Sequence, residues 1–315
     1  MRHGIRATSG DGIPEDVAEW EAIASEYSYS HGRTEPAILL RSYLSDLHQL
    51  NIALAGRDCE AAKDLYRVAA VLSSLTAWTY GNLGSYQEAG RWWRTAHRMA
   101  SISRHEATQV WVAGQQGLMA IYQPEYSADS IALMLARVEP LIALNSVADT
   151  PGSAYYFCCK SQAFAMTGRA VEAEKSLEEL RRVTSAIGAE SDTSMTGWSA
   201  SRLAFGESFA YSHLGNYDRA AAAQARSKAV SPQHSPLHHL KIELQTALCL
   251  AKTGAHADAA VHAAETLTSM PEGRHDLPAG DLARSVLRAL PESRRSGDAA
   301  GELVRYVSTR KAISA

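Results

Sequence analysis

Histidines and carboxylates at helical spacing are the first residues of this sequence whose types could support chemistry. His239 and Glu243 stand four positions apart, so a helix would place both on one face at the spacing of two metal ligands. A functional metal site needs three or more converging ligands and a second shell of hydrogen bonds. The late histidines fit polar or capping roles near one loop better, so we expect neither a metal nor another cofactor.

Three other patterns match catalytic motifs only in part. HEATQ at 105–109 has Gln109 where a zinc-protease motif needs its second histidine. GESFA at 206–210 would need a strand–turn–helix context to act as a nucleophile elbow, whereas Ser208 falls inside a predicted helix. Glu207 and His213 are six apart on that helix and diverge. We therefore predict no catalytic residue.

Composition and charge narrow the function classes. The formal net charge of the 315 residues is −3, and the basic runs Arg181-Arg182 and Arg294-Arg295 make no basic stripe, so direct nucleic-acid binding is not expected. No run reaches the roughly 18–20 apolar residues of a membrane span. The four cysteines lack CxxC spacing, which indicates reduced thiols in a cytoplasmic protein.

A repeated pattern along the chain must position any functional side chain. Four segments share an amphipathic stretch, a glycine, and a second stretch with alanine five residues after the glycine. A large apolar residue precedes each glycine by four positions. A small residue precedes each glycine by seven positions. The glycine allows a left-handed end to the first helix, the small residue allows the second helix to pack closely, and the large residue fills the gap between neighbouring hairpins. The glycine–alanine pairs are Gly84 and Ala89, Gly168 and Ala173, Gly215 and Ala220, and Gly254 and Ala259.

A fifth, degenerate unit fits between the first two. Met119 and Tyr122 follow Ala77 and Tyr80 by 42 residues, and Pro124 stands near the position of the turn glycine. The sequence thus predicts an all-α chain with five helical hairpins. We expect a tail at 1–13 and one repeat domain at 14–310, divided into an N-terminal helical pair (14–57), the repeat array (60–270) and C-terminal capping helices (280–310).

These segments resemble the tetratricopeptide family. The match is best in GNYDRAAAAQARSKAVSP at 215–232, although the consecutive turn glycines at 168, 215 and 254 are 47 and 39 residues apart, longer than the family period of about 34. The resemblance implies a right-handed superhelical stack of hairpins.

A narrower resemblance covers roughly residues 14–310. The segments that carry it are WEAIASEY at 20–27, PAILLRSYLSDL at 36–47, LTAWTYGNLGSYQEAGRWWRTAHRMA at 75–100 and TQVWVAGQQGLMAIY at 108–122. In this order they are similar to the C-terminal sensor region of actinobacterial helix-turn-helix transcriptional regulators, which implies sensing of a ligand or partner. Only glycine-rich residues precede the first segment, so we do not expect the DNA-binding domain of those regulators.

The first helix of each hairpin in such a stack lines a concave groove. Aromatic rings, amides and a few cations at the inward positions suit a peptide, a small molecule or a protein partner. We therefore expect a non-catalytic, regulatory binding protein. An enzyme with its site in the same groove is the alternative, and a homodimer is a further possibility. The predicted ligand-binding residues are Ser74, Trp78, Asn82, Gln116, Tyr155, Gln162, Arg202, Phe205, Phe209, His213 and Lys241.

Overall fold

The chain is helical wherever its structure is described. The computed structural model describes residues 17–60, 62–123, 125–188, 194–230, 236–271 and 276–313, and in these ranges all regular secondary structure is helical. The predicted all-α class is therefore confirmed. None of the helices in these ranges is both long and apolar enough to cross a membrane. The predicted tail at 1–13 lies outside the described residues.

Four helix pairs coincide with the four strongest repeats. Their first helices are α3 (Lys63–Asn82), α9 (Pro151–Met166), α11 (Ala200–Leu214) and α13 (Pro236–Lys252). Their second helices are α4 (Tyr86–Ser103), α10 (Ala170–Ile187), α12 (Tyr217–Val230) and α14 (His256–Thr268). The turn glycines at 84, 168, 215 and 254 have φ of 77°, 74°, 68° and 94°. This left-handed conformation is the one that the sequence pattern required of them.

The fifth pair has a shortened second helix. Its first helix is α5 (Glu106–Ile121), and its second, α6 (Ala128–Ala136), has only nine residues. Two single-turn helices, α7 (Glu139–Ile142) and α8 (Asn145–Ala148), follow before α9 begins. The predicted turn residue Pro124 lies outside the described residues.

The flanking helices differ from their predicted bounds at several ends. They are α1 (Val17–Ser30), α2 (Pro36–Leu54), α15 (Leu277–Ala289) and α16 (Asp298–Ile313), with a short 3₁₀ turn at Glu292–Arg294. The first capping helix begins three residues before the predicted 280. The reason is local: the Asp276 carboxylate accepts a hydrogen bond from the Ala279 amide at 3.0 Å and caps the helix, with Pro278 in its first turn.

The first helices of the pairs pack side by side in chain order, from α3 through α5, α9, α11 and α13 to α15. Glycine permits the closest of these approaches. A Cβ atom on Gly114 of α5 would lie 3.0 Å from the backbone of Tyr155 on α9, and one on Gly117 would lie 2.5 Å from Cys159 Sγ. The two helices therefore meet at a distance that only glycine allows on this face of α5.

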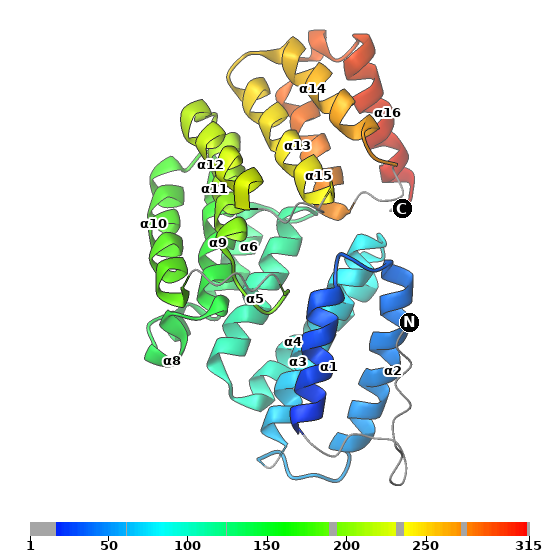
Figure 1. Ribbon diagram of the computed structural model, residues 1–315, viewed down its shortest axis with the longest axis vertical. Helices are drawn as coiled ribbons and strands as arrows, with labels where there is room; N and C mark the ends of the chain where they lie inside the picture. The colour runs from blue at the N-terminus through cyan, green and yellow to red at the C-terminus, as the bar shows by residue number, and fades with distance from the viewer. Residues whose placement is uncertain are drawn as a thin grey trace.

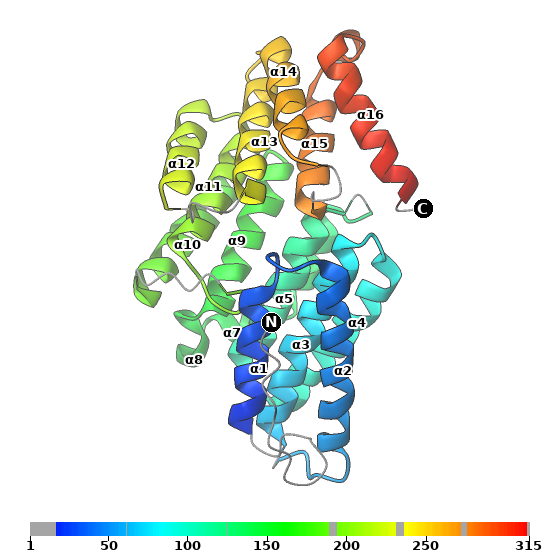
Figure 2. The same cartoon turned by 45° about the vertical axis from the view of Figure 1, so that its right-hand side comes forward.

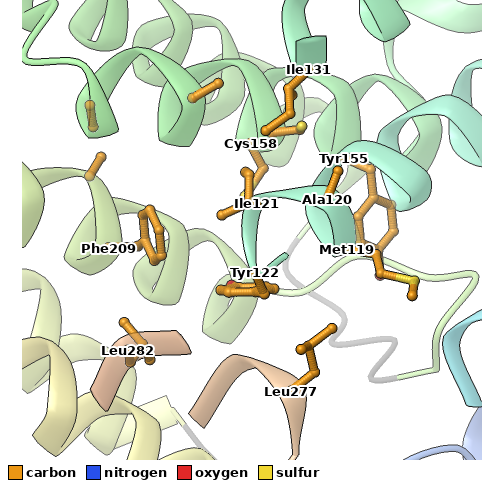
Figure 3. Close-up of a cluster of buried hydrophobic side chains, with 14 of the residues drawn as sticks. Met119, Ala120, Ile121, Tyr122, Ile131, Tyr155, Cys158, Phe209, Leu277 and Leu282 are labelled. Carbon is orange, nitrogen blue, oxygen red and sulfur yellow. The ribbon is translucent and has the colours of Figure 1, made fainter. Parts of the chain in front are cut away.

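The row of first helices is bent into a tight arc (Figures 1 and 2). The Tyr122 and Phe209 rings, from the end of α5 and from α11, meet edge to face at 6.0 Å although α9 stands between these helices in the row. Further along, the Leu277 amide donates to Asn82 Oδ1 at 3.4 Å, and Arg284 donates to the Tyr122 carbonyl at 3.3 Å. Figure 3 shows Tyr122 and Phe209 facing the side chains of α15. The inner side of the arc is therefore largely filled.

The glycine contact predicts opposite effects for two substitutions. Gly114→Ala forces a methyl group against the α9 backbone and is expected to lower the free energy of unfolding by about 1–3 kcal/mol. Gly90→Ala, in α4, meets only the end of Arg94 at 3.9 Å and should be neutral or stabilising by up to about 1 kcal/mol. Urea unfolding followed by circular dichroism measures both, and equal effects would contradict the proposed role of Gly114.

Candidate functional site

The inner face, the side of the arc lined by the first helices, does not expose all of the eleven predicted binding residues. Six side chains are partly exposed: Asn82, Gln116, Arg202, Phe205, His213 and Lys241. Five are buried: Ser74, Trp78, Tyr155, Gln162 and Phe209. The expectation that all eleven line an open groove is wrong for the buried five.

The tight arc explains this burial. Phe209 has no exposed surface and packs against Tyr122 from across the arc. Trp78 donates through Nε1 to Gln115 Oε1 at 2.9 Å, which joins α3 to α5 beneath the surface. Ser74 bonds the Ala70 carbonyl of its own helix at 2.8 Å. These side chains hold the wall of the arc together.

Five polar side chains from separate parts of the chain interact with one another on the inner face, two of them beside the Phe205 ring, and we call the five the inner polar cluster. They are His31, Arg202, His238, Lys241 and Asp276, and all are partly exposed. Lys241 Nζ bonds Asp276 Oδ2 at 2.8 Å and lies 6.0 Å from the centre of the Phe205 ring. The His238 ring lies 5.5 Å from the same ring. The cluster thus combines cations, a carboxylate and imidazoles with an aromatic surface.

Local structure fixes the orientation of these groups. Ser199 caps α11 and places Arg202 in its first turn, where the guanidinium lies 5.4 Å from the Tyr155 ring and bonds the Gly197 carbonyl at 3.3 Å. Asp276 uses one oxygen to cap α15 and the other to hold Lys241. The cluster is therefore built from helix starts, whose backbone geometry the caps define.

Burial sets the protonation states in the cluster. It lowers the pKa of His31 to about 4, with a further lowering by the Arg202 charge against a raising effect of Asp276. Burial also lowers the pKa of His238 to about 4, helped by Lys241, His239 and Arg202. The pKa of Arg202 falls to about 10 for the same reason. At neutral pH the two imidazoles are therefore neutral and the Arg202 guanidinium stays charged.

Sequence reasoning found Arg202, Phe205 and Lys241 but missed His31, His238 and Asp276. His238 stands in the histidine-rich stretch already noted, and that local signal pointed to it. His31 lies in the turn between α1 and α2, 171 residues before Arg202, and Asp276 lies at a helix start. No spacing within one repeat connects these two with the inner face.

Two of the exposed predicted residues bond elsewhere. Gln116 Oε1 pairs with His97 Nε2 at 2.7 Å, between α5 and α4. His213 stacks on Phe209 with ring centres 4.0 Å apart and pairs with the Phe209 carbonyl through Nδ1. Burial lowers the pKa of His213 to about 4. Gln116 therefore links α5 to α4, whereas His213 contacts its own helix, α11.

The residues of the partial catalytic motifs cap a helix, lie buried in the core or are held in ion pairs. His105 caps α5 by accepting from the Thr108 amide at 3.2 Å, and Ser208 has no exposed surface. The Glu207 carboxylate is held by Arg181 at 2.6 Å and Arg226 at 2.7 Å, away from the His213 contacts. Glu207 and His213, which are six apart in the sequence, thus bond to different partners.

A separate cavity of about 470 Å³ lies between α13 and α14, at the histidine and carboxylate that stand at metal-ligand spacing in the sequence. His239 and Glu243 line it together with His262, whose Nε2 bonds the Glu243 carboxylate at 2.9 Å. This bond and an ion pair with Lys228 lower the pKa of Glu243 to about 2. Among the residues that the structure describes, no group of three or more histidines, cysteines or carboxylates is arranged to hold a metal ion.

Comparisons with models of protein families, with curated proteins and with solved structures found no match to this chain. The resemblance to a regulator's sensor region therefore rests on the quoted segments alone. The candidate site is the inner polar cluster beside the Phe205 ring, on the inner face of an all-α protein.

The lowered histidine pKa values predict an acid-sensitive fold. The unfolded chain takes up protons near pH 6.5, whereas folded His31 and His238 stay neutral down to about pH 4. Stability is therefore present above pH 6.5 and lost as the pH falls towards 4, by about 1–2 kcal/mol per histidine at pH 5. His238→Gln should reduce the loss measured by urea unfolding at pH 7 and pH 5. The control is His256→Gln, outside the cluster, and an unchanged pH dependence in His238→Gln would argue against this origin.

Proposed function

We propose that this protein is a non-catalytic binding module that holds a peptide, a small molecule or a segment of a protein partner on its inner face. The observation that carries the proposal is the inner polar cluster. Its side chains come from the α1–α2 turn, α11, α13 and the start of α15 and keep part of their surface accessible, and two of them, His238 and Lys241, lie beside the Phe205 ring. Convergent polar groups on an aromatic surface are typical of ligand sites.

The chemistry of the cluster favours a ligand with both apolar and charged parts. The Phe205 and His238 rings offer flat surface, and Arg202 and Lys241 offer charged donors close to it. A carboxylate or a peptide carbonyl suits such donors because charge-assisted hydrogen bonds are about twice as strong as neutral ones. An amphipathic ligand therefore fits better than a purely apolar one.

A regulatory role, a tetratricopeptide-like right-handed superhelix and a cytoplasmic location complete the proposal. The repeat register and the resemblance to a sensor region support the first two. The location is supported by the cysteines, of which Cys158, Cys159 and Cys249 are buried free thiols. Burial raises the pKa of all three, so they are protonated and unreactive.

A thermal-shift screen with short peptides and carboxylate metabolites, followed by calorimetry, tests the proposal. For a ligand so found, Lys241→Gln and Phe205→Ala are each expected to weaken binding by about 10–100-fold, because each removes a donor or an aromatic surface that meets the ligand. Arg94→Ala, on the exposed side of α4, is the control and should leave the affinity unchanged. Ligands whose affinity is insensitive to both cluster variants would overturn the assignment of this site.

A further inference from the structure

A short segment of the chain itself lies against the inner face. Residues Ser194–Trp198 belong to the connection between the end of α10 at Ile187 and the start of α11 at Ala200. Beyond residue 188, the structure describes residues 194–199 of this connection, and among them Ser194, Gly197 and Trp198 are buried.

The Met195 carbonyl is bound from α5 by two side chains at once. Trp111 donates through Nε1 at 3.2 Å and Gln115 through Nε2 at 3.0 Å. Gln115 is oriented for this task because its Oε1 accepts from Trp78 at 2.9 Å. Two side-chain donors of α5 thus bind one backbone carbonyl, and a contact with α3 orients one of them.

The opposite edge of the segment is bound by α1. The Met195 amide donates to the Ser28 carbonyl at 3.1 Å, and the Thr196 amide donates to Ser28 Oγ at 2.9 Å. The segment therefore lies between α1 and α5 and uses backbone groups on both edges. The Met195 side chain packs against the apolar residues of both neighbouring parts of the core.

Trp198 fills the end of this site. Its ring retains 2% exposure and meets the Tyr155 ring edge to face at 5.0 Å, and its Nε1 donates to Thr184 Oγ1 at 2.9 Å. Between the two side chains, the Gly197 carbonyl accepts from Arg202 of the inner polar cluster at 3.3 Å.

These contacts are the ones by which proteins bind extended peptides: backbone groups supply hydrogen bonds and a few side chains fill pockets. We propose that Ser194–Trp198 is the resident occupant of a peptide-binding site, and that a partner peptide with an apolar residue and, three positions later, a tryptophan replaces it. This inference rests on the proposed binding function and names the peptide as the partner class.

Replacement would also change how α1 is held. Ser28 is bonded through its carbonyl and its hydroxyl to the segment, so a peptide that displaces the segment either takes over these bonds or leaves them unmade. A ligand that presents the two amides keeps α1 in place, and one that lacks them releases it. Peptide exchange at Met195 is thereby coupled to the position of the N-terminal helix.

The test is binding of a synthetic peptide with the segment's own sequence, Ser-Met-Thr-Gly-Trp with blocked ends, measured by calorimetry. Trp198→Ala removes the resident indole and leaves Trp111, Gln115, Tyr155 and Thr184 unchanged. The peptide is expected to bind this variant and raise its melting temperature. A tethered segment competes at an effective concentration of about 1 mM, so binding to the unaltered protein should be roughly ten-fold weaker for a dissociation constant of about 100 µM.

The matched control peptide ends in alanine and should not bind the variant. Equal binding of both peptides, or no binding to a folded Trp198→Ala variant, overturns the proposal. If this variant does not fold, hydrogen exchange of the unaltered protein decides: the amides of Met195 and Thr196 should exchange faster than those inside α10. If these amides are protected from exchange as strongly as those inside α10, the segment is a permanent part of the fold and the proposal is overturned. Either of these results would overturn the peptide-exchange proposal alone. The proposed binding function would still be tested separately by the Lys241→Gln and Phe205→Ala variants.

Discussion

The close approach of α5 and α9 is the constraint on which the rest of this structure depends. Gly114 and Gly117 let the two helices meet almost backbone to backbone, and this contact sharpens the arc of first helices. The sharp arc brings Tyr122 to Phe209 and α15 to the ends of α3 and α5. Side chains that would line an open groove in a gently curved stack therefore fill the wall of this one. What stays partly exposed is the inner polar cluster, while Ser194–Trp198 covers the strip between α1 and α5.

The outer side of the arc is held by charges in a way that the inner side is not. Glu207 retains 5% exposure of its side chain, and Arg181 and Arg226 both bind it, so three helices, α10, α11 and α12, share one buried carboxylate. A buried charge is tolerated when its partners satisfy it in this way, and losing one partner is costly. In the inner polar cluster Lys241 and Asp276 are each 18% exposed and bind each other. The outer network joins three helices, whereas the inner pair joins α13 to the start of α15.

The sequence predicted the hairpins because their signals are local. A turn is indicated within a few positions by a glycine such as Gly215, which has a positive φ, and an alanine five residues later. The large residue before the turn was expected to fill the gap between hairpins, and Phe164 instead lies half-buried beneath Arg169 at 4.5 Å. Burial of Tyr155 and Phe209 was not predictable because it depends on curvature, which contacts between distant helices set. The meeting of His31 with Arg202 likewise depends on where α1 and α2 dock, and no repeat spacing encodes that.

The docking of α1 and α2 is also where the two proposals meet. These helices share one apolar cluster with a face of α3, and the remaining helices form another, so the N-terminal pair is a distinct packing unit. Such units open locally at lower free energy than the whole protein unfolds. Its ties to the inner face include Ser28, bonded to the resident segment, and His31, beside Arg202. A ligand that displaces the segment breaks the bond of Gly197 to Arg202 and the bond of Met195 to Gln115. It thereby changes the surroundings of both His31 and Ser28. If both proposals hold, occupancy of the inner face changes how α1 is held, and a sensor needs a two-state element of this kind.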